Sequence, residues 1–510
     1  MLIPRIYPVT CHTDHVGPGS VFVAIKGFKD DGSKYIQVAL ERGASTIVVQ
    51  YDSITQELQK LCQEYNAELI TVKNTRAALA ELASAALDNP ASKLKIIGVT
   101  GTKGKTTTTY IIEHILRKSG YKTALIGTIK NKILDQEVDS ERTTPESDYL
   151  HMFFAECVNN NVDYVVMEVS SHALSLDRVH GITFHAAGFT NLAPEHMDFY
   201  KDLEDYFNAK IRLFSQVQPN APLIINTDDT WGKRAHNYVL EKRKDHKNIF
   251  TFGVSNSPDI LDSPVTNSML PGYTFEIKQN SLDGLRITIK DQLTSYNRHD
   301  NTSSSQAHPT NLTHIEIHAS KLFGEFNCYN LIMSVIMCKQ LGISDVAIRE
   351  ALEYFQGVPG RLQLHTLKNG ARAFIDYAHN PSSFEQVLKT LRNISEHLII
   401  VFGCGGDRDT TKRPIMGALA AQFGDKVIVT DDNPRYENRE TIIQDIIAGI
   451  PGDRQNIVIC QPDRKKAIKM AATLADADSV IALLGKGHEA YYCINGQTLH
   501  FDDLEEIKQY

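Results

Sequence analysis

Short apolar runs alternate with segments of helical spacing along most of the chain. Up to about residue 90, the runs VFVAIKG and STIVVQ alternate with the helical patterns YIQVALERG and TRAALAELASAAL. From Leu94 onward, helical segments separate the runs LKIIGVTG, KTALIGT, VDYVVMEVS, AAGFTNL and PLIINTD. Because strands that alternate with helices form crossover connections, this order predicts parallel sheets in α/β domains.

The pattern changes twice more before the chain ends. Between residues 272 and 326 the apolar period becomes two, in YTFEIKQ, LRITIKD and THIEIHA, which predicts antiparallel strands beside the central sheet. The polar stretch 291–312, with His299 and His308, is expected to be a surface loop. After the Pro/Gly hinge FQGVPGRLQ, helices again separate the runs RAFIDYA, HLIIVFGC, KVIVT, NIVIC and SVIALLG.

The segment GVTGTKGKTTT, residues 98–108, is the strongest chemical signal in the chain. It joins an apolar strand to a helix, so Gly101 and Gly104 let the backbone approach a phosphate and Lys105 adds a positive charge. Thr106, at the start of the helix, is a candidate Mg²⁺ ligand. The loop departs from the strict Walker spacing, since its first glycine stands one residue too early.

Three domains account for the whole pattern, because 510 residues are too many for one core. We expect an α/β fold with a small N-terminal α/β domain at 1–92. A central P-loop-type ATPase domain at 93–357 would have a mostly parallel sheet plus antiparallel strands, and a Rossmann-like α/β domain would follow at 358–510.

Composition excludes several classes of protein. The 53 Lys and Arg residues against 61 Asp and Glu give a net charge of −8, so we expect no nucleic-acid partner. Eight cysteines form no CxxC pair, which predicts free thiols. The start lacks the pattern of a signal peptide, and no apolar run reaches the ~20 residues of a membrane span. We therefore expect a cytoplasmic protein without membrane insertion.

Polar side chains cluster directly after several predicted strands. A strand-end carboxylate beside a phosphate loop suits Mg²⁺, although an ordinary strand-end acid explains it as well. Lys210 alone is typical of a surface lysine. In the central domain the cluster comprises Glu168, Ser170, Ser171, His172, Asn191, Glu195, His196, Asp198 and Lys210. In the third domain it comprises Arg361, Asp376, His379, Arg408, Arg413, the turn DDNPR at 431–435, Gly485, Lys486, His488 and Glu489.

The order of these motifs resembles the Mur ligases, and among them the MurE type. The resemblance extends from about Val16 to the end of the chain and rests on TGTKGKTTT, TTPES, EVSSHAL, TNL with HMD, YFNAK, FN with YN, GR, DYAHNP, GCGGDRD, DNPR and GKGHE. It implies an ATP-dependent ligase of peptidoglycan synthesis, in which ATP phosphorylates a carboxylate and an amine attacks the acyl phosphate. It also implies ATP and Mg²⁺ as cofactors and UDP-MurNAc-L-Ala-D-Glu and meso-diaminopimelate as substrates; we expect a monomer.

The resemblance implies roles for individual residues. Lys105, His196 and Lys210 would be catalytic, and Lys210 would carry a carbamate. Mg²⁺ would be held by Thr106, Glu168, His196 and the carbamate of Lys210. ATP would contact Thr100, Gly101, Thr102, Lys103, Gly104, Lys105, Thr106, Thr107, Asn330, Arg361 and Asp376. The UDP-linked peptide would contact Thr143, Thr144 and Ser170, and the amino-acid site would comprise Arg408, Asp432, Asn433, Pro434, Arg435, Gly485 and Glu489.

The turn DNPR is the family's form for meso-diaminopimelate. The guanidinium of Arg435 would bind the distal carboxylate of this amino acid in a bidentate way. Asn433 would bond the same group, Glu489 would accept the distal ammonium, and Arg408 would meet the other carboxylate. L-Lysine lacks the distal carboxylate, so it would leave Arg435 without a partner and should be rejected.

The N-terminal domain departs from the family pattern. His12-Thr13-Asp14 stands where the family usually has Asp-Ser-Arg for uridine, and His12 with His15 alone is too little for a metal site. The hinge reads GRLQ where GRME is usual. A paralogue acting on another carrier or amino acid therefore stays open. A folylpolyglutamate or cyanophycin-type ligase would not need DNPR beside GKGHE, and a non-catalytic nucleotide-binding protein would not need Lys105, Glu168, His196 and Lys210 together.

Overall fold

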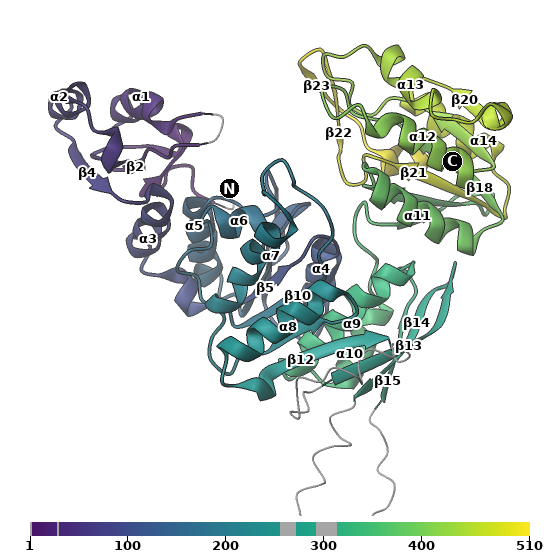
Figure 1. Ribbon diagram of the computed structural model, residues 1–510, viewed down its shortest axis with the longest axis horizontal. Coiled ribbons are helices and arrows are strands. Elements are labelled where there is room, and N and C mark those ends of the chain that lie inside the picture. The colour runs from purple at the N-terminus through teal and green to yellow at the C-terminus, as the bar shows by residue number, and fades with distance from the viewer. Residues whose placement is uncertain (1–2, 28–29, 255–271, 292–313) are drawn as a thin grey trace, which may run out of the picture. The chain divides into compact units, whose positions relative to one another are not determined.

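The computed structural model describes residues 3–27, 30–254, 272–291 and 314–510 (Figure 1). The surface loop expected at 291–312 lies outside these residues except for Asp291. Its His299 and His308 are therefore not described. The chain divides into two compact units. The first contains Met1–Glu276, Ile289–Ile315 and Tyr329–Ala351, and the second contains Ile277–Thr288, Glu316–Cys328 and Leu352–Tyr510.

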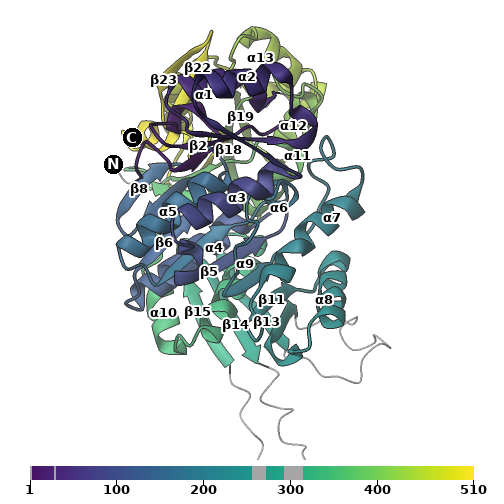
Figure 2. The same cartoon turned by 90° about the vertical axis from the view of Figure 1, so that its left-hand side faces the viewer.

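A four-stranded parallel sheet in the order β1-β2-β3-β4 begins the first unit. Its inner strand β3 is buried on both faces, since Ile47 and Val49 pack with α1 and α2 while Val48 packs with α3. The ribbon of this sheet and its helices is drawn in Figures 1 and 2. Helix α3 also contacts α5 of the following segment. The elements are β1 Val9–Thr10, β2 Val21–Val23, α1 Ile36–Glu41, β3 Thr46–Gln50, α2 Gln56–Glu64, β4 Glu68–Val72, α3 Thr75–Ala86 and α5 Ser147–Asn159.

The central sheet has the order β15-β14-β13-β12-β11-β10-β5-β9-β6-β7-β8 within the described residues. Strands β6, β9, β5, β10, β11, β12 and β13 pair in parallel, while β7 and β8 add antiparallel strands at one edge. Only two residues link the neighbours β13 and β14, which requires an antiparallel hairpin.

The strands of this sheet are β5 Lys95–Thr100, β6 Thr123–Ile126, β7 Lys130–Ile133, β8 Gln136–Asp139, β9 Tyr164–Glu168, β10 Ala186–Phe189, β11 Leu223–Asn226, β12 Ile249–Val254, β13 Gly272–Ser281, β14 Gly284–Asp291 and β15 His314–Ala319. The remaining helices of this part of the chain are α4 Lys105–Lys118, α6 Ser171–Ser175, α7 Leu203–Ile211, α8 Thr230–Lys242, α9 Glu325–Gln340 and α10 Asp345–Glu353.

The second unit is built on a six-stranded sheet in the order β16-β17-β21-β18-β19-β20. All neighbours pair in parallel except the edge strand β16, which is antiparallel to β17. Its elements are β16 Gln363–Thr366, β17 Arg372–Asp376, α11 Pro381–Ile394, β18 His397–Phe402, α12 Lys412–Phe423, β19 Lys426–Val429, α13 Arg439–Ile447, β20 Val458–Cys460, α14 Arg464–Leu474, β21 Ser479–Leu484 and α15 Asp503–Ile507.

A separate antiparallel hairpin of β22 (Tyr491–Ile494) and β23 (Gln497–His500) lies near the end of the chain. Its two-residue turn, Asn495-Gly496, has φ of +48° and +76°. Asn-Gly favours this turn because both central residues need positive φ. The sequence analysis did not predict this hairpin.

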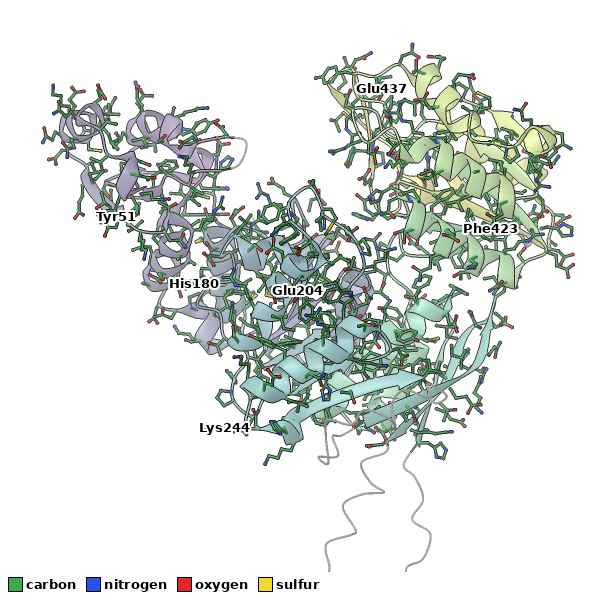
Figure 3. The ribbon with its side chains drawn as sticks, in the orientation of Figure 1. Tyr51, His180, Glu204, Lys244, Phe423 and Glu437 are labelled. Atoms are coloured by element: carbon green, nitrogen blue, oxygen red, sulfur yellow. The ribbon has the colours of Figure 1, made fainter. Side chains whose placement is uncertain are left out.

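Buried ion pairs fix the loops of the second unit. The guanidinium of Arg413 is fully buried and binds Glu437, labelled in Figure 3, through contacts of 2.6 and 2.7 Å, and Asp445 at 2.9 Å. The Gly-rich segment GCGGDRDTTKRP, with Arg408 and Arg413, predicts an anion site. For Arg413 that prediction is wrong, because its Nη1 and Nη2 pair with two carboxylates of the chain and only its Nε has no hydrogen-bond partner in the described chain.

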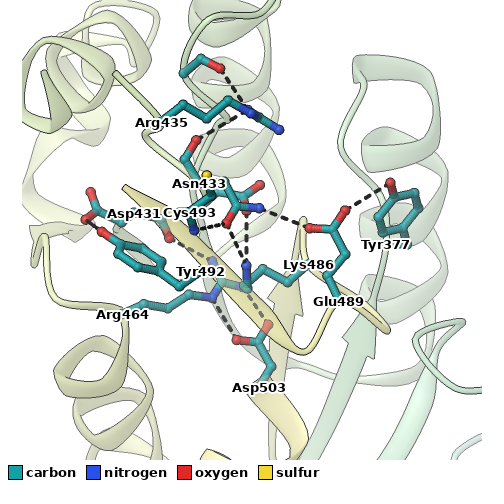
Figure 4. A network of polar contacts seen from close by, with 12 residues as sticks. Tyr377, Asp431, Asn433, Arg435, Arg464, Lys486, Glu489, Tyr492, Cys493 and Asp503 are labelled. Atoms are coloured by element: carbon teal, nitrogen blue, oxygen red, sulfur yellow. Dashed lines mark hydrogen bonds and ion pairs between the residues drawn. The ribbon is translucent and has the colours of Figure 1, made fainter. Parts of the chain in front are cut away.

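Arg464 at the start of α14 forms a second buried pair. Its Nε and Nη2 donate to Asp503 at 2.7 and 2.6 Å, and both side chains have an exposed fraction of 1% or less (Figure 4). The same guanidinium donates to the carbonyl oxygens of Asp431 and Leu484 at 3.1 Å. It therefore joins α15 to the ends of β19 and β21, where the predicted amino-acid site begins.

The α/β fold class predicted from the sequence is confirmed, with a parallel N-terminal sheet and mixed sheets in the central and C-terminal parts. All eight cysteines are free thiols, as predicted. No helix in the described ranges combines the length and the apolar character that crossing a membrane requires.

Replacing Asp503 by Asn should destabilise the second unit by about 3–5 kcal/mol, because Arg464 would stay buried without a counter-charge. Glu506→Gln on the same helix is the matched control, since its partner Lys465 is 59% exposed and such pairs contribute at most about 1 kcal/mol. Urea unfolding followed by circular dichroism measures both. Equal losses in the two variants would contradict the role given to the Arg464–Asp503 pair.

Candidate functional site

The loop between β5 and α4 is folded so that its backbone can surround an anion. Gly101 and Gly104 have φ of +144° and +89°, which side chains other than hydrogen disfavour. Lys105 Nζ donates to the carbonyl oxygens of Gly101 and Thr102, both at 2.9 Å. Because the 14-residue helix α4 begins at Lys105, its free amides and its positive dipole end face the same loop. All predicted loop residues, Thr100 to Thr107, lie in this segment.

Residues after β10 hold the loop in this shape. Asn191 Oδ1 accepts from the Lys103 amide at 3.0 Å, and its Nδ2 donates to the Lys103 carbonyl oxygen at 3.1 Å. Thr190 Oγ1 donates to the same carbonyl oxygen at 2.7 Å. The sequence analysis gave Thr190 no role, because this contact joins residues far apart along the chain.

Asn330 on α9 flanks the loop, as its predicted role requires. Its side chain is buried, and Thr108 Oγ1 donates to its Oδ1 at 3.4 Å. A methyl group built on Gly104 would lie 2.2 Å from Asn330 Oδ1. Glycine is therefore required at this position both by φ and by the close approach of Asn330.

Thr106 and Glu168 meet at the carboxyl ends of two neighbouring strands. Val99 of β5 pairs with Glu168 of β9, and Thr106 Oγ1 donates to Glu168 Oε2 at 3.0 Å. Glu168 is 1% exposed, and its other oxygen accepts from the Thr128 amide at 2.8 Å. A buried hydroxyl and a carboxylate at this distance form an oxygen-donor set of the kind that Mg²⁺ prefers.

Lys210 is a buried lysine on α7 rather than a surface one. Its exposed fraction is 1%, and its Nζ donates to the Gly101 carbonyl oxygen at 2.8 Å. Burial, followed by the nearby charge of Lys105, lowers the pKa of Lys210 well below its usual value. The lysine amine therefore lies against the phosphate loop, where burial disfavours its charged form.

His196 lies beside Lys210 in an unusual backbone conformation. Its φ is +60°, which is uncommon for a residue with a side chain and is found disproportionately at functional sites. Its ring lies 4.7 Å from that of His172 and 6.1 Å from that of Tyr206. Burial lowers the pKa of His196, so its ring tends toward the neutral form that can ligate a metal.

Tyr206 is a site residue that the sequence analysis missed. Lys210 Nζ lies 4.4 Å from the centre of its ring, and Thr102 Oγ1 donates to its hydroxyl at 3.3 Å. The spacing of four residues between Tyr206 and Lys210 on a helix was the available signal.

Among the described residues, no three His, Cys, Asp or Glu side chains converge as a ready metal site.

Thr143, Thr144 and Ser170 gather beside Glu168. Thr144 Oγ1 donates to the Glu168 carbonyl oxygen at 2.8 Å, and the Ser170 amide donates to Thr144 Oγ1 at 3.0 Å. Thr143 Oγ1 lies 3.0 Å from Thr128 Oγ1. The sequence analysis predicted these three as substrate residues, and the structure brings them together next to the Thr106–Glu168 pair.

A pocket of about 1130 Å³ lies next to this group, lined by the neighbouring residues Arg142, Pro145 and Glu146 and by residues of the N-terminal domain. Its lining includes Arg178, which the sequence analysis missed; Arg178 donates to the Thr144 carbonyl oxygen at 3.0 Å and contacts Glu146 at 2.9 Å. Burial lowers the pKa of Arg178, and its Nε has no hydrogen-bond partner. A buried guanidinium with a free donor suits an anionic part of a ligand.

His12, Thr13 and His15 line the same pocket at its N-terminal side. The ring of His15 stacks on Tyr7 at 4.1 Å and its Nδ1 lies 2.8 Å from the Arg5 carbonyl oxygen. His12 Nδ1 accepts from the Asp14 amide at 3.2 Å. These histidines are engaged by near neighbours, and the Tyr7–His15 stack presents aromatic surface to the pocket.

Arg361 and Asp376 lie together in the second unit. Asp376 Oδ2 accepts from the Leu362 amide at 2.7 Å, and its Oδ1 accepts from the Ala378 amide at 2.8 Å. The Arg361 guanidinium lies 4.9 Å from the centre of the Tyr377 ring. Burial raises the pKa of Asp376, and Arg361 opposes that shift.

The DDNPR turn and the GKGHE segment form one polar network (Figure 4). Asn433 Nδ2 donates to Glu489 Oε2 at 3.0 Å, and its Oδ1 accepts from Lys486 Nζ at 3.3 Å. Lys486 is fully buried and lies 3.6 Å from Asp432 Oδ1, an oxygen without a hydrogen-bond partner. Burial, together with the charge of Asp432, raises the pKa of Glu489.

Arg435 keeps part of its guanidinium available at this turn. Its Nη1 donates to the carbonyl oxygens of Gly406 and Asn433 at 2.8 and 3.4 Å, and across the described chain no carboxylate pairs with it. Arg408 is exposed on the facing loop, and a methyl group built on Gly405 would lie 2.8 Å from Arg435 Nη1 and 3.7 Å from Arg408 Cγ. The two arginines therefore flank Gly405, as expected for a site that binds carboxylates.

Three family models match successive parts of the chain. Residues 5–86 match the model described as Mur ligase family, catalytic domain, residues 99–338 match the Mur ligase middle domain, and residues 360–487 match the Mur ligase, glutamate ligase domain.

Relatives match this chain over nearly its whole length. A UDP-N-acetylmuramoyl-L-alanyl-D-glutamate–2,6-diaminopimelate ligase of Clostridium tetani is 40% identical over 499 residues, which cover 97% of this chain and 92% of that protein. The ligase of the same name from Bacillus licheniformis is 36% identical, covering 99% and 94%. A solved structure of such a ligase is 28% identical with a TM-score of 0.65, covering 98% of this chain and 94% of the other.

Gly104→Ala should weaken ADP binding at least tenfold, because the methyl group would collide with Asn330 and strain φ; tenfold corresponds to about 1.4 kcal/mol. Gly120→Ala, at the other end of α4, is the matched control, since its φ is +91° and a methyl group there meets no atom within 4 Å. Isothermal titration calorimetry measures both affinities. Equal weakening would show that backbone strain, and not the loop's approach to Asn330, is responsible.

Proposed function

Because the chain belongs to the Mur ligase family and is therefore an ATP-dependent, amide-forming and ADP-producing ligase, we propose that it acts as a MurE-type enzyme. Its substrates would be UDP-N-acetylmuramoyl-L-alanyl-D-glutamate and meso-2,6-diaminopimelate. The observation that carries this choice is the Arg435 guanidinium, which has free donors and no carboxylate partner in the described residues, beside Asn433 and Glu489. The enzyme would act as a cytoplasmic monomer with domains at 1–92, 93–357 and 358–510.

The reaction has two steps. The γ-phosphoryl group of ATP passes to an oxygen of the peptide's terminal carboxylate, which releases ADP and leaves an acyl phosphate. The amine of the amino acid then forms the C–N bond, phosphate departs with its oxygen, and the amine loses a proton. Since both steps bring anions together, the cation of Lys105 and the amides of the phosphate loop provide the stabilisation that this chemistry needs. Asn330, Arg361 and Asp376 would contact the nucleotide.

Thr106 and Glu168 suit Mg²⁺, because they are buried oxygen donors in contact with each other. Bound there, the ion would neutralise charge on the transferred phosphoryl group. His196 and Lys210 would hold a second ion only if the Lys210 amine is converted to a carbamate, since an ammonium cannot ligate a cation. Burial of Lys210 beside Lys105 supports this, because a neutral amine is the form that reacts with carbon dioxide.

The pocket beside Thr143, Thr144 and Ser170 would take the UDP-linked peptide, with Arg178 as a further anion ligand. Its far end is lined by His12 and Thr13, where the family usually has Asp-Ser-Arg, so the uridine would be met by other groups than usual. This departure supports a second candidate function, the same ATP chemistry on another carrier.

Amino-acid selection would rest on the distal end of the ligand. Arg435 and Asn433 Nδ2 are donors for a carboxylate, whereas Glu489 is an acceptor for an ammonium. Arg408, on the facing loop, would meet the second carboxylate. L-Lysine lacks the distal carboxylate, and hydrogen bonds to charged groups contribute about 1.5–3 kcal/mol, so its kcat/KM should be about 10–100 times lower.

The test is phosphate release from ATP, Mg²⁺ and UDP-N-acetylmuramoyl-L-alanyl-D-glutamate with either amino acid. We expect turnover with meso-diaminopimelate and a kcat/KM about 10–100 times lower with L-lysine. A preference for lysine would exclude the proposed amino acid. Turnover with neither, but with another carrier, would favour the second candidate function.

Two glycine variants test the Arg435 assignment within the same assay. Gly405→Ala should raise the KM for diaminopimelate about tenfold, since its methyl group would push the guanidinium aside, and should leave the KM for ATP unchanged. Gly452→Ala, whose methyl group meets no atom within 4 Å, should change neither constant.

Lys210→Ala should lose activity by at least about a hundredfold, because the proposed carbamate ligand disappears. Short carboxylic acids such as formate or acetate added to this variant should restore part of the activity by filling the space next to His196. Lys103→Ala, on the loop but not proposed as a metal ligand, serves as the comparison and should gain nothing from added carboxylates. Absence of rescue in Lys210→Ala would count against the carbamate.

A further inference from the structure

The β22–β23 hairpin contacts the DNPR turn mainly through its backbone. The Cys493 amide donates to Asn433 Oδ1 at 2.9 Å, and the Cys493 carbonyl oxygen accepts from the Arg435 amide at 3.0 Å (Figure 4). The Asn495 amide donates to the Arg435 carbonyl oxygen at 2.6 Å. A short parallel bridge thus joins Arg435 to Ile494.

These bonds decide which atoms Asn433 presents. A backbone amide is only a donor, so the atom of Asn433 that faces Cys493 must be the carbonyl oxygen. The buried Lys486 ammonium on the same oxygen at 3.3 Å requires the same orientation. The NH₂ group must then point toward Glu489, where it is available to a carboxylate.

The same bonds fix the backbone of Arg435. Its φ is +54°, a conformation that costs a residue with a side chain about 1–2 kcal/mol. Because the hairpin bonds both its amide and its carbonyl oxygen, this conformation is held from both sides. The direction in which the guanidinium leaves the turn depends on it.

Tyr492 ties the hairpin to the start of the turn. Its hydroxyl donates to Asp431 Oδ2 at 2.7 Å and accepts from Arg439 Nη2 at 2.7 Å, and Arg439 also pairs with Asp431 at 2.5 Å. Burial and the neighbouring Asp431 raise the pKa of Tyr492 to about 12, so the hydroxyl remains a donor at neutral pH.

We propose that this hairpin, residues 491–500, is a positioning element that sets the amino-acid specificity of the site. Tyr492, Cys493 and Asn495 are its positioning residues; they orient the Asn433 amide and the Arg435 guanidinium for a distal carboxylate without touching the ligand. The assignment of the ligand rests on the function proposed above. Because an isolated two-stranded hairpin is only marginally stable, and β23 is exposed along its whole length, its Asn495-Gly496 turn is the point at which it can be loosened.

Gly496→Val tests the proposal, since valine tolerates a φ of +76° poorly and so weakens the hairpin. Its Cβ would also lie 2.8 Å from the hydroxyl of Tyr436, a 77% exposed side chain that can move aside. Gly342→Val, with φ of +88° in an exposed loop of the first unit, is the control. Hydrogen exchange of residues 430–437 should accelerate at least about tenfold in Gly496→Val only. The KM for diaminopimelate should rise about fivefold or more while the KM for ATP stays within about twofold, since the competent site is less populated.

Tyr492→Phe keeps the turn intact and provides a second variant if Gly496→Val does not fold. It should show smaller increases in the exchange rate of residues 430–437 and in the KM for diaminopimelate, with a lower preference for diaminopimelate over L-lysine. Faster exchange with unchanged kinetic constants, or unchanged exchange in both variants, would overturn the proposal. Equal loss of affinity for ATP would also overturn it, since that indicates a merely structural role.

The proposed function of the enzyme and the proposed role of the hairpin can be refuted independently of each other. If the wild-type enzyme does not use diaminopimelate, the proposed function fails. The hairpin is then judged by the exchange rates of residues 430–437, and by the KM of whichever amino acid the wild-type enzyme accepts.

Discussion

The parallel pairing of β5 with β9 is the constraint on which the chemistry of the first unit depends. Parallel strands end at the same edge of a sheet, and the register that pairs Val99 with Glu168 brings the carboxylate level with the phosphate loop. Thr106 then reaches Glu168 at 3.0 Å from the first turn of α4. A shift of one residue in this register would turn Glu168 to the opposite face of the sheet and separate the two groups.

In the second unit, parallel strands also end at one edge of the sheet, but the residues that follow them are of a different kind. Strands β17, β18, β19 and β21 end at one edge, and the segments that follow them carry Asp376, Arg408, the DDNPR turn and GKGHE. Here the groups are mainly arginines, amides and carboxylates, which supply the donors and acceptors that the proposed zwitterionic amino acid needs. The buried Arg464–Asp503 and Arg413–Glu437 pairs hold the loops in place, so that Arg435 remains free for a ligand.

Much of the fold could be predicted from the sequence because its strands are short apolar runs between clear helical segments. The phosphate loop, Glu168 and the DNPR turn could be located because each lies at or directly after the end of such a run. Thr190 and Arg178 could not, since their roles depend on contacts between elements distant along the chain. Tyr206 had a local signal in its four-residue spacing from Lys210, but its contact with Thr102 joins distant segments. The β22–β23 hairpin had an Asn-Gly signal, but its strands YYCI and QTLH are not an alternating apolar pattern.

Two residues with proposed site roles stand in the left-handed region of φ, His196 at +60° and Arg435 at +54°. Each conformation costs free energy that surrounding contacts must offset. For Arg435 these contacts are visible, because Cys493 and Asn495 bond its amide and carbonyl oxygen. For His196, its carbonyl oxygen accepts from the amides of Phe199 and Tyr200, both at 3.0 Å, while the ring of His172 packs against its own. In both units a strained residue is therefore held by its neighbours so that one side chain points in a direction that an unstrained backbone would not provide.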